Sequence, residues 1–161
     1  MNVQKSEKGF TIIEVVLVLA IAGLIFLMVF IALPALQRSQ RDQARKNDAS
    51  TVAAAVQTFK GNNNGGLTGL TTARLQQYID KLDQYDKANV AITTGATVNP
   101  NLDQVLVRAS SKCPLTLPAP GTALTPRTGA ANGVTNRNAI AVVKLENNGT
   151  NDQWQIYCVE V

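Results

Sequence analysis

The chain passes from an apolar N-terminal run to an amphipathic stretch and then to a polar remainder. Residues 15–33 carry no polar side chain. Together with residues 10–13 they are long enough to cross a hydrocarbon core as a helix, for which about 20 residues suffice. One carboxylate, Glu14, lies near the start of this run. A charge deep in a membrane costs about 2.5–3.5 kcal/mol, and a simple anchor has no use for one. The pattern therefore predicts a membrane-spanning helix whose Glu14 awaits a partner.

The helix is predicted to continue beyond the apolar run as far as Lys60. Residues 37–60 are rich in helix formers and place apolar side chains on one face, at the spacing of a helix that packs on a core. These side chains belong to Ala49, Val52, Ala53, Val56 and Phe59. A run of glycine and asparagine at 61–66 ends the helix. Gly23 and Pro34 both weaken a helix, so a kink or local opening is expected in the segment that they bracket.

The remaining residues, 61–161, predict a globular head. Thr71 or Thr72 is expected to cap a second helix, whose core face is formed by apolar residues at helical spacing. These are Leu75, Tyr78, Ile79, Leu82 and Tyr85. Short strands are expected at 90–92, 104–108, 139–145 and 153–159, with an Asn-Gly hairpin signal in 147–151 and a proline-rich surface loop at 113–137. The sequence thus predicts an α+β fold, in which the long helix packs against a small antiparallel β-sheet.

A short basic leader ends at Gly9 and is followed by Phe10 and, four residues later, by Glu14. A cleaved secretory signal fits poorly, because the apolar run exceeds the usual length of about 7–15 residues and residues 31–35 lack a small-x-small cleavage site. A plain signal anchor fits the run but leaves the glutamate unexplained. The order of these residues resembles the prepilin signal of type IV pilins and pseudopilins, over residues 5–40 of the chain.

The resemblance implies that a prepilin peptidase removes residues 1–9 on the cytoplasmic side. The cut would fall between Gly9 and Phe10, and the new N-terminal Phe10 would be methylated. Residues 10–36 would span the cytoplasmic membrane before assembly and form the filament core afterwards, with the head outside. The implied partners are the membrane, the peptidase, an assembly platform in the membrane and further copies of this chain.

For Glu14 the resemblance implies a role in assembly. In the family this glutamate is thought to meet the N-terminal amine of an adjacent subunit, here the amine of Phe10. A carboxylate among apolar helices is tolerated when it is paired, and head-to-tail contacts that do not close give a helical filament. The alternative is that Glu14 is merely a favourable charge near a helix N-terminus.

The two cysteines, Cys113 and Cys158, both lie in the half that would be exported. In an oxidising compartment such a pair is most simply one disulfide, and many type IV pilins close a C-terminal region in this way. The bond would join the proline-rich loop to the last strand. It should stabilise the fold by about 4 kcal/mol. The alternative is two separate buried thiols.

The sequence gives no catalytic or metal-binding pattern. It contains no histidine, which removes the commonest metal ligand and general base. It also lacks a phosphate loop, a nucleophile elbow and a CxxC pair. Asp80, Asp83 and Asp86 would share one face of the second helix, where a solvated surface is favoured over a calcium site. We therefore expect no enzyme activity, no metal site and no cofactor.

The net charge of +4 raises the question of an anionic partner. The densest group of cations follows the apolar run and is offset by one acid. It consists of Arg38, Arg41, Arg45 and Lys46, with Asp42 as the acid. These cations could meet anionic headgroups or acids of neighbouring subunits. No aromatic residue or nucleic-acid module accompanies them, so DNA is the least favoured partner. The positive-inside rule would keep them in the cytoplasm, but large domains cross membranes despite their charge and a disulfide requires the outside.

These observations together predict a structural subunit of a type IV pilus, polymerised into an extracellular filament for adhesion, motility or DNA uptake. The alternative is a pseudopilin of a type II secretion or competence system. The presence of Glu14 argues against the tip subunits that lack it, and the cysteine pair favours the pilus. A membrane-anchored enzyme would need a polar cluster that the sequence does not contain.

Overall fold

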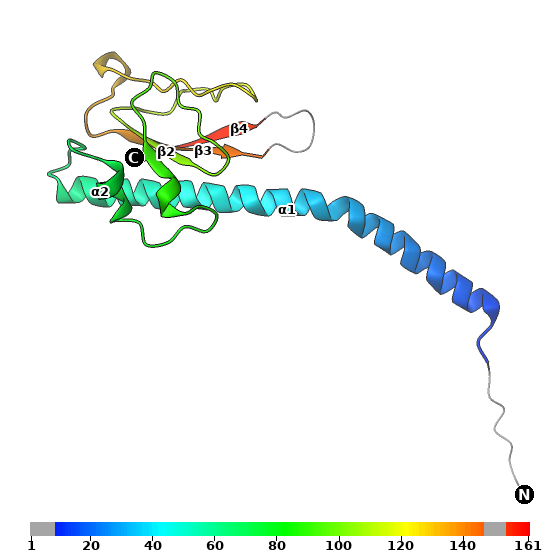
Figure 1. Cartoon of the computed structure of the whole chain (residues 1–161). Coiled ribbons are helices and arrows are strands. Elements are labelled where there is room, and N and C mark those ends of the chain that lie inside the picture. The colour runs from blue at the N-terminus through cyan, green and yellow to red at the C-terminus, as the bar shows by residue number, and fades with distance from the viewer. Residues whose placement is uncertain (1–8, 147–153) are drawn as a thin grey trace, which may run out of the picture. The chain divides into compact units, whose positions relative to one another are not determined.

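The computed structural model describes residues 9–146 and 154–161 (Figure 1). The chain forms two compact units, Met1–Gln37 and Arg38–Val161. The long helix α1, Ile12–Asn62, contributes to both. Most of the expected leader and the expected Asn-Gly hairpin turn lie outside the described residues.

The first unit consists, where it is described, of a short extended segment and the N-terminal part of α1. The helix is long and apolar enough to cross a membrane. Its large apolar side chains from Ile12 to Leu36 are 47–85% exposed, so no part of the chain that the structure describes buries them. The helix continues through Gly23 and Pro34 without a break. The expected local flexibility of this segment stays a prediction.

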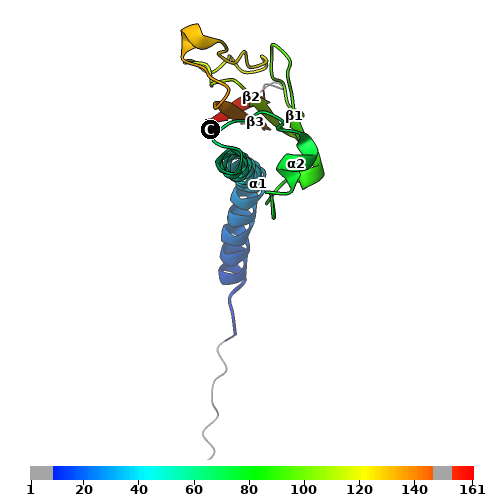
Figure 2. The ribbon, with the colours of Figure 1, turned by 90° about the vertical axis from the view of Figure 1, so that its left-hand side faces the viewer.

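The second unit, called the head below, contains a four-stranded sheet in the order β1-β2-β3-β4 (Figures 1 and 2). The strands are β1 (Val90–Ile92), β2 (Val105–Ala109), β3 (Ala139–Leu145) and β4 (Gln155–Glu160). The pairs β2–β3 and β3–β4 are antiparallel, as expected. The pair β1–β2 is parallel, so the sheet is mixed rather than antiparallel. Residues 93–104 provide the crossover of about a dozen residues that a parallel pair needs.

The inner face of the sheet packs on the C-terminal part of α1. All five residues of the predicted apolar stripe are buried. Phe59, at the end of this stripe, makes an edge-to-face contact with Tyr78, with ring centroids 5.8 Å apart. The helix ends in a Schellman turn, in which Asn64 has a positive φ of 54° and the N–H of Gly65 donates to the carbonyl of Lys60 over 2.8 Å. The fold is thus the expected α+β arrangement of a long helix against a sheet.

The outer face of the sheet is covered by loop segments. Val98 and Leu124 form an isolated antiparallel bridge and pack on Ile140, Val142 and Ile156 of the sheet. Consequently β3 is buried on both faces and reads as a nearly continuous apolar run. The proline-rich segment expected as loop contains only a short 3₁₀ helix, Ala130–Asn132, and bridge contacts. A disulfide joins Cys113 and Cys158 on this side, with Cα atoms 6.0 Å apart.

The second helix is much shorter than predicted. Thr71 caps it by accepting a hydrogen bond from the N–H of Arg74, but α2 spans only Thr72–Gln76. The five residues predicted for its core face are buried or half-buried, yet the last four follow the end of the helix. Asp48 of α1 keeps residues 83–85 out of the predicted helix, because its carboxylate binds their backbone N–H groups.

Candidate processing and assembly site

The predicted cleavage site lies in an extended, solvent-exposed segment directly before α1. Gly9 and Phe10 have no regular secondary structure, and the Phe10 side chain is 90% exposed. Within the part of the chain that the structure describes, no atom beyond the chain neighbours of Gly9 lies within 4 Å of the position that a Cβ would occupy there. A peptide bond in such a segment is accessible to a peptidase.

Thr11 and Glu14 form a capping box at the start of α1. Glu14 Oε2 accepts hydrogen bonds from the Thr11 backbone N–H over 2.8 Å and from the Thr11 hydroxyl over 2.7 Å. The Glu14 N–H in turn faces Thr11 Oγ1 at 3.4 Å. This reciprocal pattern satisfies N–H groups that an uncapped helix leaves open. The Thr-x-x-Glu spacing is visible in the sequence and gives Glu14 a partner within its own chain, which our sequence analysis missed.

In the head, α1 is fastened to the sheet by a group of charges that we call the polar clamp. It consists of Arg41, Asp42, Arg45 and Glu146. Glu146, directly after β3, accepts from Arg41 through both carboxylate oxygens, over 3.1 and 2.7 Å, and from Arg45 over 2.7 Å. Asp42 accepts from the Arg45 guanidinium over 2.9 Å and from the Glu146 backbone N–H over 2.8 Å. Arg45 is only 3% exposed, so the clamp holds a buried cation that two carboxylates neutralise.

The clamp changes the electrostatics of the groups that it joins. The hydrogen bonds from Arg41, supported by Arg45, lower the pKa of Glu146 to about 2. Burial raises the pKa of the neighbouring Tyr85 to about 12. The Tyr85 hydroxyl and the Nε of Arg45 are buried without a hydrogen-bond partner among the described residues. Both the acid and the phenol therefore keep one charge state over the whole physiological pH range.

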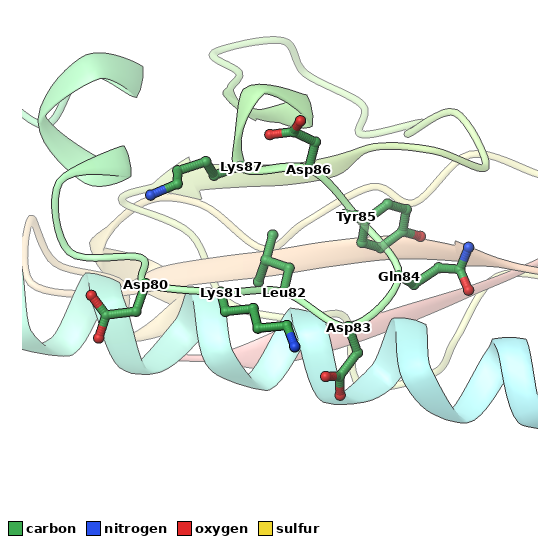
Figure 3. Close-up of a pocket in the computed structure, with 8 residues that line it drawn as sticks. All are labelled: Asp80, Lys81, Leu82, Asp83, Gln84, Tyr85, Asp86 and Lys87. Carbon is green, nitrogen blue, oxygen red and sulfur yellow. The ribbon is translucent and has the colours of Figure 1, made fainter.

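A second fastening is made by the fully buried Asp48. Its carboxylate accepts from the backbone N–H groups of Asp83, Gln84 and Tyr85 over 2.6, 2.7 and 2.9 Å. These bonds hold the segment of residues 80–87 alongside α1, where it lines a shallow open pocket (Figure 3). Three N–H donors stabilise a buried carboxylate without a cation.

The three aspartates considered for calcium do not share a helix face, because residues 80–86 are not helical. Asp83 accepts from the Asn47 side chain, and Asp86 caps the 3₁₀ helix Lys87–Asn89 through the N–H of Ala88. Within the described ranges, no group of three or more potential metal ligands is found. The shared helix face on which the calcium alternative depended is therefore not formed.

The cations expected to face headgroups or other subunits are largely engaged within the head. Arg41 and Arg45 belong to the polar clamp, and the ammonium of Lys46 lies 5.7 Å from the ring centre of Tyr157. Arg38 is exposed. The sequence analysis missed Glu146 as the acid for these arginines, because no local spacing links positions that lie 105 residues apart.

The disulfide is held in a small polar framework. The Cys113 N–H donates to Glu160 Oε1 over 2.8 Å, and Arg127 Nε donates to the Cys113 carbonyl over 2.8 Å. Arg127 also lies 3.4 Å from Glu160. These contacts tie the proline-rich loop to β4 beside the covalent bond, in the arrangement that was predicted for the cysteine pair.

Comparison with protein families finds a match at the N-terminus of the chain. Residues 4–30 fit the family described as the prokaryotic N-terminal methylation motif. This motif is the signature of prepilin-peptidase substrates, the class that comprises type IV pilins and pseudopilins. The match includes Gly9, Phe10 and Glu14, and it points to a structural subunit that is anchored in a membrane by its N-terminal helix. Comparisons with curated proteins and with solved structures give no match.

Proposed function

We propose that the chain is a structural subunit of a type IV pilus, extracted from the cytoplasmic membrane and polymerised into a helical extracellular filament. The observation that carries this proposal is the methylation motif at the start of a helix whose apolar side chains are uncovered over seven turns. Such a surface must be covered by lipid or by other subunits. A disulfide-stabilised head at the other end of the chain fits an exported fibre.

Processing is the first step of the proposed mechanism. The peptidase removes residues 1–9, cutting the exposed bond between Gly9 and Phe10, and Phe10 becomes a methylated N-terminus. The head lies outside the membrane at this stage. The cut leaves Thr11 and Glu14 intact, so the capping box survives in the mature subunit.

Glu14 is the proposed assembly residue. In the free subunit its carboxylate is held by Thr11, which lowers the cost of keeping a charge beside an apolar segment. During assembly, the cationic amine of Phe10 from a neighbouring subunit pairs with Glu14. The apolar residues 10–36 then exchange lipid for the same residues of other copies. Because both environments are apolar, this exchange does not fix where each subunit stops along the filament. The acid–amine pair sets that position.

Different parts of the chain take different tasks in this proposal. Residues 10–36 form the membrane anchor and later the filament core, and residues 37–60 carry the head of residues 61–161. Gly23 and Pro34 give the core segment its capacity to adjust when lipid is replaced by protein. The filament serves adhesion, motility or DNA uptake. Its partners are the peptidase, the assembly platform and copies of itself.

The alternative is a pseudopilin of a type II secretion or competence system. The methylation motif favours it as much as the pilus, because both classes carry the motif. The two functions differ in their product. A pilin gives long fibres on the cell surface, whereas a pseudopilin gives a short assembly that stays with the cell envelope.

Electron microscopy of cells with and without this chain tests the proposal. We expect surface fibres only when the chain is present, and mass spectrometry of sheared fibres should give a mature protein that begins at N-methylated Phe10. A processed chain that never leaves the envelope would favour the pseudopilin. A mature N-terminus at Met1 or near Ala35 would exclude both.

A further inference from the structure

Two polar atoms beside α1 are buried without a hydrogen-bond partner among the described residues. They are Nε of Arg45 and the hydroxyl oxygen of Tyr85. Arg45 is 3% exposed and Tyr85 is 5% exposed, so bulk solvent does not reach either atom. Buried donors and acceptors are nearly always paired with protein or with ordered water, because an unpaired group forfeits the hydrogen bond that it makes to water in the unfolded chain. Each of the two atoms therefore requires a partner.

The two atoms belong to neighbouring side chains. Arg45 and Asp48 lie three residues apart on α1 and so share one face of the helix. Asp48 accepts from the Tyr85 N–H over 2.9 Å, which places Tyr85 against this same face. Burial raises the pKa of Tyr85, and the positive charge of the nearby Arg45 opposes that rise. One small molecule can therefore serve both side chains.

The other contacts of these side chains leave the two atoms without a direct bond to each other. The terminal nitrogens of Arg45 donate to Asp42 over 2.9 Å and to Glu146 over 2.7 Å. These bonds fix the plane of the guanidinium, so the Nε–H cannot turn toward a distant acceptor. Figure 3 shows the Tyr85 hydroxyl directed away from Lys87, so the far side of the shallow pocket does not supply its partner.

We propose that one internal water molecule bridges Arg45 and Tyr85. The water oxygen accepts from the Arg45 Nε–H, and a second hydrogen bond joins the water to the Tyr85 hydroxyl, which can donate or accept. A buried water of this kind is held by a few polar partners that would otherwise be unsatisfied. An ion suits the position less well, because Asp42 and Glu146 already neutralise the charge of Arg45.

The bridge joins two attachments of α1 that the direct contacts leave separate. The polar clamp binds Glu146 after β3, and Asp48 binds the backbone of residues 83–85. Tyr85 belongs to the second attachment through its N–H and to the first through the water. The segment of residues 80–87 and the end of β3 are thereby coupled through α1. A hydrogen-bond network of this kind stabilises a fold by more than its separate pairs.

A crystal structure of the full-length chain in detergent, at a resolution that shows ordered water, tests the site directly. We expect a water peak within hydrogen-bond distance of both Arg45 Nε and the Tyr85 hydroxyl. A direct contact between the two atoms would overturn the proposal. So would two atoms that remain unpaired with no density between them.

Tyr85→Phe gives a second readout, because it removes the hydroxyl and keeps the ring. We expect the water peak to disappear and the midpoint of denaturant unfolding to fall. The matched control is Tyr78→Phe, which removes a hydroxyl from a half-buried ring at 3.5 Å from the Asn62 amide. It should leave the midpoint nearly unchanged. A midpoint that is unchanged or higher in Tyr85→Phe would show that its hydroxyl has no partner, and would overturn the proposal.

The coupling of the two attachments gives a third readout. Glu146→Gln and Tyr85→Phe are made singly and together, and the unfolding free energies are compared. We expect the double variant to lose less than the sum of the single losses, because each change loosens the same network. Additive losses would show that the two attachments are independent and would overturn the bridge. All three readouts use isolated subunits, so they do not depend on whether the chain forms a pilus.

Discussion

The two parts of α1 belong to one helix but solve opposite problems. Before Gln37 the helix exposes its apolar side chains on all sides, and none of the described residues buries them. After Arg38 it buries one apolar stripe against the sheet, and its charged side chains bind other segments of the head. The partners of the first part must come from outside the molecule, whereas those of the second are already present. Sequence continuity therefore does not imply a common role.

The treatment of carboxylates shows the same contrast. Among the described residues, Glu14 is held only by the neighbouring Thr11, on an exposed helix end, and so remains available to a new partner. Asp48 is fully buried and binds three N–H groups of a segment more than 30 residues away. Glu14 can therefore change its partner, whereas Asp48 keeps the same hydrogen bonds as long as the head is folded.

The sharpest test of this contrast is Glu14→Gln. Glutamine also serves in a capping box, so the helix start is kept while the charge is lost. We expect normal insertion, normal cleavage after Gly9 and a near-complete loss of fibres, with processed subunit accumulating in the membrane. Immunoblotting and electron microscopy give the two readouts.

The matched variant is Thr11→Val, which removes the hydroxyl of the cap but keeps the carboxylate. It should assemble much better than Glu14→Gln. If Thr11→Val fails in assembly and Glu14→Gln succeeds, helix capping rather than charge is the contribution of this site. Head stability should be unaffected in both variants.

Asp48→Ala should give the largest loss of head stability. The change leaves three buried N–H groups without an acceptor and should lower the free energy of unfolding by about 4–5 kcal/mol. Denaturant unfolding followed by circular dichroism measures the effect. Asp80→Ala removes the same charge from an exposed position nearby and should stay within about 0.5 kcal/mol of the parent. Similar losses in the two variants would contradict the role of Asp48.

Removal of the disulfide should have the next largest effect. Cys113→Ser with Cys158→Ser should lower the unfolding free energy of the head by about 3–4 kcal/mol, because the unfolded chain regains the freedom that the closed loop removes. Membrane insertion should not change, since it depends on residues of the first unit. Peptide mapping without reducing agent checks the bond itself, and two free thiols in exported protein would disprove it.

Glu146→Gln should cost less, about 2–3 kcal/mol, because Arg45 keeps Asp42 as a partner. The pH dependence gives a second readout. The pKa of Glu146 is lowered to about 2 in the folded head, below its ordinary value of 4.5. Its contribution to stability is therefore complete above about pH 4.5 and is lost as the pH falls toward 2. The variant should show a flatter stability profile over that range, and an equally steep one would contradict the clamp.

The local features of the fold could be predicted from the sequence. The buried stripe from Ala49 to Phe59 follows from helical spacing, and the Gly-Asn run after Lys60 marks the end of the helix. The two antiparallel strand pairs follow from short apolar runs. The capping box could also have been predicted from the spacing of Thr11 and Glu14, but the sequence analysis considered only the glutamate.

The structural features that could not be predicted from the sequence depend on contacts between residues that lie far apart in the chain. Residues 77–86 have a helical pattern, but Asp48 binds the backbone N–H groups of residues 83–85, which a helix would have used. The direction of β1 is set by pairing with β2 across a crossover and is not encoded in its three residues. Likewise, nothing near Arg41 and Arg45 indicates Glu146, so the clamp became visible only in three dimensions.

The polar clamp also has a consequence for the order of folding. A helix forms within about a microsecond, but the Arg41–Glu146 contact must close a loop of more than 100 residues. Pairings so distant along the chain slow folding, and β3 brings both Glu146 and part of the apolar cover for α1. Until β3 docks, part of the apolar stripe of the helix stays open to solvent after translocation. The time during which the new subunit can aggregate is therefore set by the arrival of this one strand.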